Sequence, residues 1–387
     1  MQYRQFGKLD WKVSALGFGA MRLPILDGKT SNIDQAKATE MIRYAIDNGV
    51  NYFDTAYVYH DQKSEGAVGL ALKDGYRERI KIATKLPIWL VKTTADFDRL
   101  LNEQLERLQT DHIDFYLLHA LNKGSWQKIL DLGLIQEAEK ALADGRIHHL
   151  GFSFHDKLDT FKQIVDGYDK WTFCQIQYNF MDTEFQAGKE GLQYAATKGL
   201  AVVIMEPLRG GKLAADIPAA RPLWESAPIQ RKPADWALQW LWNQPEVAVV
   251  LSGMSTLDQL KENVESAAIS SIGLLSAQEL DLVEKVNKEL TARSPIPCTS
   301  CEYCLPCPHG VNIPRNFESY NNAAMYNDVN DSRMDYKMWI SDPEKASECI
   351  QCDECLDKCP QQIAISTWMP VIDSVLGQGQ PFVEKVA

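Results

Sequence analysis

VNYFDT, residues 50–55, is a short apolar run that ends in a carboxylate and a threonine, and a polar loop and a helical stretch follow it. The chain contains eight such runs: VSALGFG (13–19), VNYFDT (50–55), IKIATK (80–85), IDFYLLH (113–119), IHHLGFS (147–153), FCQIQYN (173–179), AVVIME (201–206) and VAVVLSG (247–253). Gly19, Asp54, Lys85, His119 and Ser153 mark the ends of the first five and lie 35, 31, 34 and 34 residues apart. That interval fits one strand plus one crossover helix, so the pattern predicts eight βα units.

Eight consecutive βα units favour a closed parallel barrel, the (β/α)8 or TIM-barrel architecture of the α/β class, over an open doubly wound sheet. The segments between the runs have helical periodicity; Phe97, Leu101, Leu105 and Leu108, for example, share one face. No GxGxxG motif follows an early strand, which makes a Rossmann fold the weaker alternative. The opening residues YRQFGKLDWKVS (3–14) are expected to form a hairpin that plugs the bottom of the barrel.

The overall charge limits the classes of partner. A net charge of −12 and a pI near 5.2 describe an acidic surface that repels phosphate, which argues against nucleic acid or an anionic membrane. The chain has no apolar run of about 18 residues, and its N-terminus lacks the apolar core and cleavage site of a signal peptide. We therefore expect a cytoplasmic protein without membrane insertion, whose cysteines face a reducing solution.

The composition changes after a predicted helix at residues 276–290. ARSPIP (292–297), with two prolines, is typical of a stiff linker. The chain beyond it is rich in cysteine and poor in aliphatic residues, so it is expected to fold around an inorganic group more than around its own core. The predicted domains are a barrel at residues 1–291 and a small cysteine-rich domain at 292–387.

Three ionisable residues end consecutive strands of the predicted barrel. Asp54 ends VNYFDT, Lys85 ends IKIATK and His119 ends IDFYLLH. The active sites of such barrels lie at the C-terminal ends of the strands, and a buried charge is costly without a partner or a task. Any one of these residues could simply face water at a strand end. All three in one barrel mouth indicate a functional site.

FDTAYVYHDQKSE (53–65), together with LGFGAMRLP, ATKL, YLLHA, GFSFH, QIQYN and PLRGGKL, resembles the aldo-keto reductases over residues 1 to about 290. The resemblance implies that Tyr59 is the general acid and that Lys85, Asp54 and His119 complete a catalytic tetrad. A phenol with a pKa of about 10 is a poor acid at neutral pH unless a nearby ammonium stabilises its phenolate. Lys85, held by Asp54, would do so. Tyr57 is the rival phenol, and the family spacing favours Tyr59.

The same resemblance implies NAD(P)H extended over the barrel mouth. The residues that it assigns to the nucleotide are Gly19, Ala20, Met21, Asp54, Ser153, Gln175, Met205, Pro207, Leu208, Gly210, Lys212, Gly253, Gln259, Glu262 and Asn263. Ser153 and Gln175 match carboxamide-binding positions, and the loop at 207–212 matches the pyrophosphate loop, where glycines permit close backbone approach. Gly253 and Gln259 replace the Lys and Arg that often grasp a 2′-phosphate, which leaves NADH and NADPH both open.

The runs CTSCEYCLPCP (298–308) and CIQCDECLDKCP (349–360) supply soft thiolate ligands. The second has the spacing of the bacterial ferredoxin run, in which three cysteines hold one [4Fe–4S] cluster and the fourth holds another. On this interpretation one cluster is bound by Cys349, Cys352 and Cys355 with Cys307, and the other by Cys298, Cys301 and Cys304 with Cys359. The first run departs from the pattern, with two residues before its fourth cysteine. Two zinc sites, each with four cysteine ligands, are the alternative, although a zinc ribbon needs no third cysteine in each run.

The chain as a whole resembles aldo-keto reductases fused to a ferredoxin-like domain with two [4Fe–4S] clusters. The segments between the cysteine runs, 310–328 and 333–348, are expected to be helical. The implied substrate is a carbonyl compound or its alcohol, near Met21, Arg22 and Trp89. Cys174, inside a predicted strand, is interpreted as a small buried apolar residue.

The two halves carry electrons differently, because nicotinamide transfers a hydride and a [4Fe–4S] cluster passes one electron. The chain has no recognisable flavin motif to mediate between them. Three functions are compatible with this. The barrel could be a reductase with structural clusters, or the clusters could exchange electrons with the substrate or an external donor or acceptor protein. Alternatively, the chain could be an electron-transfer or sensing subunit that binds nucleotide without reducing carbonyls. The complete tetrad favours catalysis, and the complete cysteine motifs favour redox-active clusters.

Overall fold

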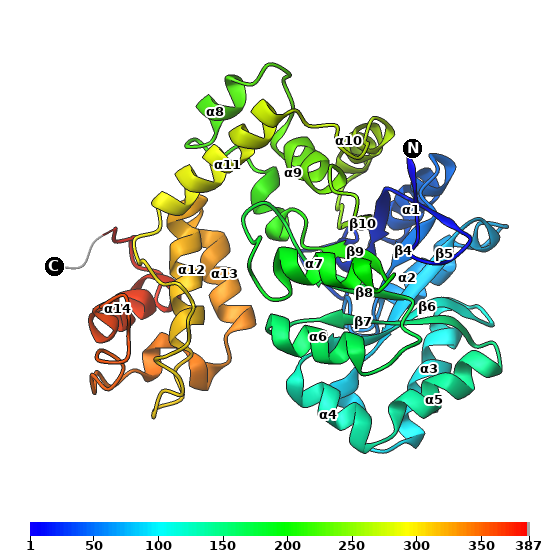
Figure 1. The fold of residues 1–387 in the computed structure, drawn as a ribbon, viewed down its shortest axis with the longest axis horizontal. Coiled ribbons are helices and arrows are strands. Elements are labelled where there is room, and N and C mark those ends of the chain that lie inside the picture. The colour runs from blue at the N-terminus through cyan, green and yellow to red at the C-terminus, as the bar shows by residue number, and fades with distance from the viewer. Residues whose placement is uncertain (385–387) are drawn as a thin grey trace. The chain divides into compact units, whose positions relative to one another are not determined.

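Eight parallel strands close into a barrel in the computed structural model (Figure 1). They are β3 (Leu16–Gly19), β4 (Tyr52–Asp54), β5 (Lys81–Leu86), β6 (Ile113–Leu121), β7 (Ile147–Phe154), β8 (Phe173–Gln177), β9 (Ala201–Met205) and β10 (Val247–Ser252). Their order is β10-β3-β4-β5-β6-β7-β8-β9, so strands that follow one another along the chain are neighbours in the barrel, and the last strand closes it against the first. Each of the eight apolar runs supplies one strand, and the predicted (β/α)8 barrel is confirmed.

Helices cover the outside of the barrel. They are α1 (Gln35–Asp47), α2 (Ser64–Ala71), α3 (Ala95–Leu108), α4 (Lys123–Asp131), α5 (Leu134–Ala143), α6 (Leu158–Asp166), α7 (Gly188–Thr197), α9 (Pro233–Trp242) and α10 (Leu257–Ala268). In α3, Phe97, Leu101 and Leu108 are buried and Leu105 lies at the edge of the same stripe. Burial of such a stripe stabilises helices that would be marginal in isolation.

The N-terminal hairpin closes the bottom of the barrel, as predicted. Strands β1 (Tyr3–Gln5) and β2 (Lys12–Ser14) pair antiparallel. The turn between them packs on the start of β9, where a Cβ at Gly7 would lie 2.8 Å from the amide nitrogen of Ala201. The ring of Phe6 enters the barrel interior, with its centroid 4.7 Å from that of Phe115 and 5.7 Å from that of Phe173. A site can therefore form only at the opposite end, where the strands finish.

Strand register brings the candidate residues to that end at similar heights. Gly19 of β3 pairs with Asp54 of β4, and Ser153 of β7 pairs with Gln175 of β8. Lys85 is the penultimate residue of β5. The pleat alternates side chains between interior and exterior, so register decides which of them meet inside the mouth.

The structure describes residues 1–384, which divide by their internal contacts into two compact units. The first unit holds Met1–Ala215 and Arg231–Leu280, and the second holds Asp216–Gln230 and the chain from Asp281 onward. The division falls inside helix α11 (Ala277–Ala292). The bounds of this helix are close to those predicted from the sequence, 276–290. Within the described residues, every helix is too short or too polar to cross a membrane.

The second unit has a hydrophobic core of its own. Its other helices are α8 (Arg221–Glu225), α12 (Ile313–Met325), α13 (Val329–Trp339) and α14 (Ile365–Ile372) (Figure 1). The helix expected at 310–328 is confirmed by α12, whereas the one expected at 333–348 begins earlier and ends at Trp339, and short turns follow it. Phe317, Tyr320, Tyr336, Trp368 and Met369 are buried together. The composition therefore understated this core, in which aliphatic side chains such as Ile365 and Ile372 pack with the aromatic ones. That the region folds mainly around an inorganic group stays a prediction.

Short helical turns connect the longer elements. The 3-10 turns are η1 (Ala20–Arg22), η2 (Arg77–Arg79), η3 (Ile88–Leu90), η4 (Arg209–Ala214), η5 (Asp342–Glu344) and η6 (Ala346–Glu348), and a π-helical turn, η7 (Asp373–Gly377), follows α14. Three of them, η1, η3 and η4, follow barrel strands β3, β5 and β9 and so belong to the mouth of the barrel.

Candidate active site and cysteine pockets

Lys85 is the centre of the polar cluster at the barrel mouth. Its side chain is fully buried, and its Nζ donates to Asp54 Oδ1 at 2.6 Å and to the carbonyl oxygen of Thr55 at 2.7 Å. The Tyr59 hydroxyl lies 3.4 Å from the same Nζ. The structure thus brings Asp54, Lys85 and Tyr59 together, as the resemblance implied. Strand ends β4 and β5 and the turn after β4 hold the three groups.

The electrostatics of the cluster keep Lys85 charged. Burial acts to lower the pKa of Lys85, but the carboxylate of Asp54 and the Tyr59 hydroxyl outweigh it, so the pKa is raised. For Tyr59, burial raises the pKa and exceeds the opposing attraction of Lys85. The Lys85 ammonium does act to lower the pKa of this phenol, as expected, but burial raises the pKa by more. Tyr59 therefore holds its proton at neutral pH, as a general acid must.

His119 completes the cluster as a neutral imidazole. Burial, followed by the charge of Lys85, brings its pKa well below the usual value. Its Nδ1 is buried and has no hydrogen-bond partner among residues 1–384. The ring stands edge-on to Tyr59 with 6.3 Å between centroids, and the half-exposed ring of Trp89 lies 5.0 Å away. A neutral imidazole in this position can donate one hydrogen bond to a small polar molecule in the mouth.

Tyr57, the rival phenol, has a different environment. Its hydroxyl donates to Glu103 Oε2 at 2.7 Å, and the Arg107 guanidinium lies 4.1 Å from its ring centroid. These partners belong to α3, on the outside of the barrel. Tyr57 therefore packs beside the strands, and its hydroxyl is committed to Glu103.

The residues assigned to the nicotinamide end of the nucleotide lie on neighbouring strands. Ser153 Oγ accepts the amide hydrogen of Ala120 at 2.8 Å. Gln175 is buried; its Nε2 lies 3.6 Å from the sulfur of Met205, and its Oε1 is unpartnered within the described residues. An unsatisfied buried amide oxygen costs free energy unless a ligand or water reaches it. This orphan atom fits a site for an amide-bearing group such as a carboxamide.

The loop assigned to the pyrophosphate has the backbone that glycine allows. Gly210 and Gly211 have φ of 70° and 103°, a region that other residues avoid. Arg22, which follows Gly19, Ala20 and Met21, reaches this loop: its Nη2 lies 3.5 Å from a Cβ built at Gly210, and its stem covers Gly253. The sequence indicated the loss of a cation at position 253, because a glycine stands there. In the structure, Arg22 brings a cation to the same place. Its proximity to the loop was not foreseen from the sequence.

The remaining nucleotide candidates are spread along the mouth. Pro207, Leu208 and Lys212 belong to the loop and turn after β9. At the start of α10, Gln259 Oε1 accepts the amide hydrogen of Ser255 at 2.9 Å. Further along α10, Glu262 pairs with Lys232 at 2.6 Å, and Asn263 Nδ2 donates to Ser252 Oγ at 3.0 Å. These α10 side chains already have partners within the chain. The contact of Glu262 and Asn263 with the adenine, which the family resemblance implies, and the place of Gln259 near a 2′-phosphate stay predictions.

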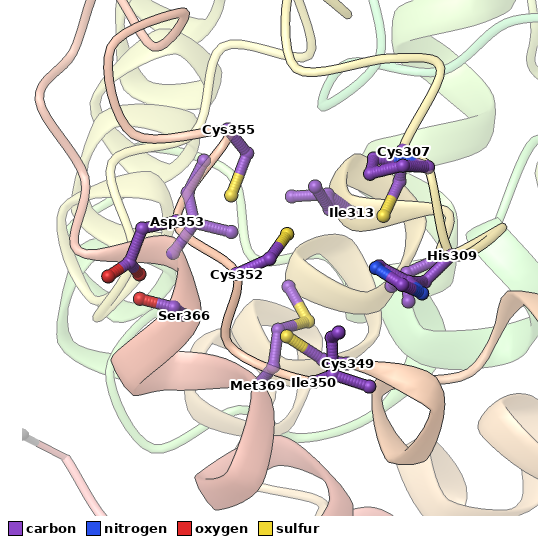
Figure 2. Close-up of a pocket in the computed structure, with 13 residues that line it drawn as sticks. Cys307, His309, Ile313, Cys349, Ile350, Cys352, Asp353, Cys355, Ser366 and Met369 are labelled. Atoms are coloured by element: carbon purple, nitrogen blue, oxygen red, sulfur yellow. The ribbon is translucent and has the colours of Figure 1, made fainter.

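The eight clustered cysteines line two separate pockets of the second unit. One pocket, of about 350 Å³, is lined by Cys307, Cys349, Cys352 and Cys355, whose sulfur atoms point into it (Figure 2). The other, of about 310 Å³, is lined by Cys298, Cys301, Cys304 and Cys359. Each pocket takes three cysteines from one run and the fourth from the other run. This is the grouping expected from the ferredoxin pattern, including the exchange of the fourth cysteine.

The two loops that present these cysteines share one backbone conformation. The residues before and after the second cysteine of each run have positive φ: Ser300 at 53°, Glu302 at 62°, Gln351 at 55° and Asp353 at 65°. The amide of Ser300 donates to Cys298 Sγ at 3.4 Å, and the amide of Gln351 hydrogen-bonds the thiol of Cys349 in the same way. Left-handed non-glycine residues are costly and cluster at functional sites. The loops are therefore built to direct thiols and backbone amides at a common ligand.

The pocket walls suit a bulky inorganic group with sulfur ligands. Ile313 and Ile365 line both pockets and form the apolar partition between them. Burial raises the pKa of Cys304 and of Cys355 to about 11, so these thiols need a metal's positive charge to act as thiolates. Four convergent thiols in an apolar wall are the donor set that iron–sulfur clusters use.

A further set of metal-type ligands lies at the closed end of the barrel. His112, Asp114 and His148 have ligand atoms within 4.8 Å of one another. Lys81 Nζ lies 2.8 Å from Asp114 Oδ1, and Arg77 Nη2 lies 2.9 Å from Asp114 Oδ2 and 3.1 Å from His112 Nε2. Two cations already neutralise the one carboxylate, so the set is an ion-pair network rather than a metal site.

Known families match two parts of this chain. The model described as the aldo/keto reductase family matches residues 15–288, and the 4Fe-4S dicluster domain matches residues 297–364. The chain belongs to the aldo/keto reductase family. This family of oxidoreductases is joined here to a C-terminal 4Fe–4S ferredoxin-type domain, which favours iron–sulfur over the zinc alternative.

Several relatives of the reductase barrel are known. L-galactose dehydrogenase of Arabidopsis thaliana is 30% identical over 308 residues, which cover 73% of this chain and 93% of the plant protein. Protein tas of Escherichia coli is 26% identical over 356 residues, covering 76% of this chain and 100% of its own. The holo form of aldo-keto reductase AKR11C1 from Bacillus halodurans has 30% identity and a TM-score of 0.60, with 74% and 96% of the two chains covered. A Klebsiella pneumoniae aldo-keto reductase solved with NADPH, at 23% identity and a TM-score of 0.60 over 74% of this chain and 95% of its own, shares the fold.

A buried polar network beneath Lys85 was not found from the sequence. Gln104 Nε2 donates to Glu65 Oε1 at 2.7 Å and to the carbonyl oxygen of Lys85 at 3.1 Å, and Thr84 Oγ1 donates to Glu65 Oε1 at 2.7 Å. Tyr116 completes the network by donating to Gln104 Oε1 at 2.7 Å. A signal was present, because Gln104 is a polar residue on the apolar face of α3. Its partners come from other elements and could not be named in advance.

Proposed function

We propose that the protein is an NAD(P)H-dependent oxidoreductase that interconverts a carbonyl compound and its alcohol, with a barrel domain at 1–291 and an iron–sulfur domain at 292–387. The observation that carries the proposal is the buried Lys85 ammonium between the Asp54 carboxylate and the Tyr59 hydroxyl. A phenol beside a fixed ammonium, in a barrel mouth, is suited to proton transfer. Membership of the aldo/keto reductase family supports the same chemistry.

In the direction of reduction, Tyr59 donates its proton to the carbonyl oxygen. The hydride that the carbonyl carbon receives is what NAD(P)H supplies when bound. Lys85 stabilises the phenolate left on Tyr59, and Asp54 keeps the ammonium oriented. Neutral His119 donates a hydrogen bond to the same substrate oxygen and so polarises the carbonyl. In oxidation the Tyr59 phenolate accepts the proton of the alcohol.

We assign the carboxamide of the nucleotide to Ser153 and Gln175, where the orphan Gln175 oxygen supports it. The pyrophosphate is assigned to the glycine turn at Gly210, with Arg22 nearby as a cation. The choice between NADH and NADPH is not assigned, because Gly253 brings no side chain to a 2′-phosphate.

The cysteine pockets are assigned to two [4Fe–4S] clusters, one in each. When bound, such clusters pass single electrons. We propose that they exchange electrons with the reaction or with an external donor or acceptor protein, rather than serving only as structural supports. The acidic surface supports a protein or small-molecule partner over nucleic acid. Nine cysteines that form no disulfide support a reducing, cytoplasmic setting.

The test is carried out on full-length protein purified anaerobically. Iron, acid-labile sulfide and co-purifying nucleotide are measured per chain, and NADH and NADPH oxidation is followed with a panel of aldehydes and ketones. The reverse reaction is assayed with alcohols and aldoses that include L-galactose, because the Arabidopsis relative is named for that substrate. We expect turnover with at least one pair. Nucleotide binding without any turnover across the panel would favour an electron-transfer subunit instead.

The pKa of Tyr59 predicts opposite pH profiles for the two directions. Reduction uses the protonated phenol, whose pKa burial raises, so kcat for reduction should stay level through neutral pH and fall only in alkaline solution. Oxidation uses the phenolate, so its kcat should rise with pH over the same alkaline range. Rates for one carbonyl–alcohol pair, measured in both directions from neutral to alkaline pH, check this. A reduction rate that increases with pH would contradict the role of Tyr59.

A further inference from the structure

The turn that carries Tyr59 has an unusual backbone. His60, Asp61 and Gln62, which follow Tyr59 directly, have φ of 51°, 50° and 68°. Three consecutive non-glycine residues in the left-handed region are sterically costly and persist only where surrounding contacts impose them. The turn ends where α2 begins at Ser64, whose amide donates to the Tyr59 carbonyl oxygen at 3.2 Å.

The imidazole of His60 makes the contacts that impose this turn. The ring is buried, and its Nε2 accepts the amide hydrogen of Leu23 at 3.1 Å. Its Nδ1 lies 2.7 Å from the carbonyl oxygen of Thr30. A backbone amide can only donate and a carbonyl can only accept, so the ring is neutral with its proton on Nδ1. Both nitrogens are used, and both partners belong to the segment 20–33 that follows β3.

Two neighbouring side chains join the same segments. Thr30 Oγ1 donates to Asp61 Oδ2 at 3.2 Å, and Ser64 Oγ donates to the carbonyl oxygen of Ala20 at 2.8 Å. The segment 20–33 begins with the residues assigned to the nucleotide, Ala20 and Met21. The turn that carries the acid and the segment assigned to the cofactor are therefore bonded to each other through the buried side chains of His60 and Ser64 and through the exposed pair Thr30–Asp61.

We propose that His60 is a positioning residue. It fixes the turn of Tyr59 to the segment 20–33, so that the general acid and the residues assigned to the cofactor, Ala20 and Met21, keep one relative placement. His60 does not touch the reacting atoms and acts through Tyr59. The inference rests on the proposed role of Tyr59 for its catalytic consequence. The coupling of the two segments does not depend on that role.

Five variants separate the contacts of His60 from the strain of the turn. His60→Ala removes both hydrogen bonds and keeps the steric cost, whereas His60→Gly removes both bonds and the cost. His60→Asn keeps a donor near the Nδ1 position and tolerates the left-handed conformation, and His60→Gln keeps an acceptor near the Nε2 position. Gln62→Gly is the matched control, because it relaxes a left-handed residue of the same turn without touching the imidazole; it also removes the hydrogen bond that Gln62 Oε1 accepts from Arg107 at 3.0 Å, which lies outside the segment 20–33.

The first readout is amide hydrogen exchange of segments 20–33 and 56–64 in the full-length protein, which requires no activity. We expect both segments to exchange at least about tenfold faster in His60→Ala and His60→Gly, and to match the wild type in Gln62→Gly. Asn and Gln at position 60 should give intermediate exchange. Unchanged exchange of segment 20–33 in both His60→Ala and His60→Gly would overturn the proposal, whether or not the protein proves to be a carbonyl reductase.

The second readout is steady-state kinetics with the best carbonyl substrate. Displacement of Tyr59 should lower kcat about tenfold or more, while KM for the carbonyl changes less than about threefold. Recovery of kcat should follow the order of exchange protection, with Asn and Gln above Ala. A kcat within about twofold of wild type in His60→Gly, despite faster exchange, would show that His60 supports structure only and would also overturn the proposal.

Discussion

Replacement of Tyr59 by phenylalanine is expected to lower kcat for carbonyl reduction by roughly 100- to 10,000-fold, the range that a general acid contributes. The substitution removes the proton donor and leaves the Lys85 ammonium bonded to Asp54 and to the Thr55 carbonyl oxygen. The ion pair, which would be expensive to break, therefore survives. The measurement is single-turnover reduction with saturating NAD(P)H, so that binding and chemistry are separated.

Tyr57→Phe is the matched control for this experiment. It removes a phenol two residues away whose hydroxyl contacts Glu103 on α3, at a cost to stability of about 0.5–1.5 kcal/mol. Its kcat should stay within about twofold of wild type, because Tyr57 contacts none of the mouth residues named above. Iron content should be unchanged in both variants. If Tyr59→Phe turned over carbonyls at a rate near that of Tyr57→Phe, the assignment of the acid would have to be abandoned.

Pairs of cysteine substitutions should distinguish crossed from uncrossed cluster ligation. Cys301 and Cys359 line the same pocket although they belong to different runs, whereas Cys352 and Cys359 belong to one run but line different pockets. We expect Cys301→Ala with Cys359→Ala to destroy one cluster and leave about half of the roughly eight iron atoms that two clusters hold. Cys352→Ala with Cys359→Ala should damage both clusters and leave neither with its wild-type EPR signal.

The readout is iron, acid-labile sulfide and EPR of the dithionite-reduced protein, prepared without oxygen. Cys174→Ala is the control, because this cysteine is buried in β8 among barrel residues and should leave both clusters intact. The opposite result, in which the pair from one run spares a cluster and the pair from different runs spares none, would establish uncrossed ligation. Metal analysis that found zinc in place of iron would remove the clusters from the proposal altogether.

The fold could be predicted because its signal is local and repeated. Eight apolar runs at a regular interval leave a parallel barrel as the architecture that buries all of them, and every run became a strand. The hairpin plug also followed from a local signal, the turn at Gly7. The core of the second unit was underestimated, because Tyr320, Tyr336 and Trp368 stand far apart in the chain and meet only after α12, α13 and α14 fold.

The candidate site was partly predictable for a similar reason. Asp54, Lys85 and His119 could be found because each ends an apolar run of the sequence and lies at, or within two residues of, the end of its strand, and parallel strands bring their ends together. The cation next to Gly210 and Gly253 could not, because Arg22 arrives from the loop after β3 and not from the positions that the family pattern marks. The anchor at His60 depends on amide and carbonyl groups of residues 23 and 30, which carry no side-chain signal.

The amino-acid order by itself determined the barrel, the acidic character of the chain and the chemical types at the mouth and in the cysteine runs. These are properties of periodicity, charge and spacing, which exist along the chain before it folds. Only the tertiary structure decided which phenol meets Lys85 and which fourth cysteine enters which pocket. It also decided that burial affects the pKa of Tyr59 more than the charge of Lys85 does. Those outcomes depend on distance and desolvation, and both arise only when segments far apart in the chain pack against one another.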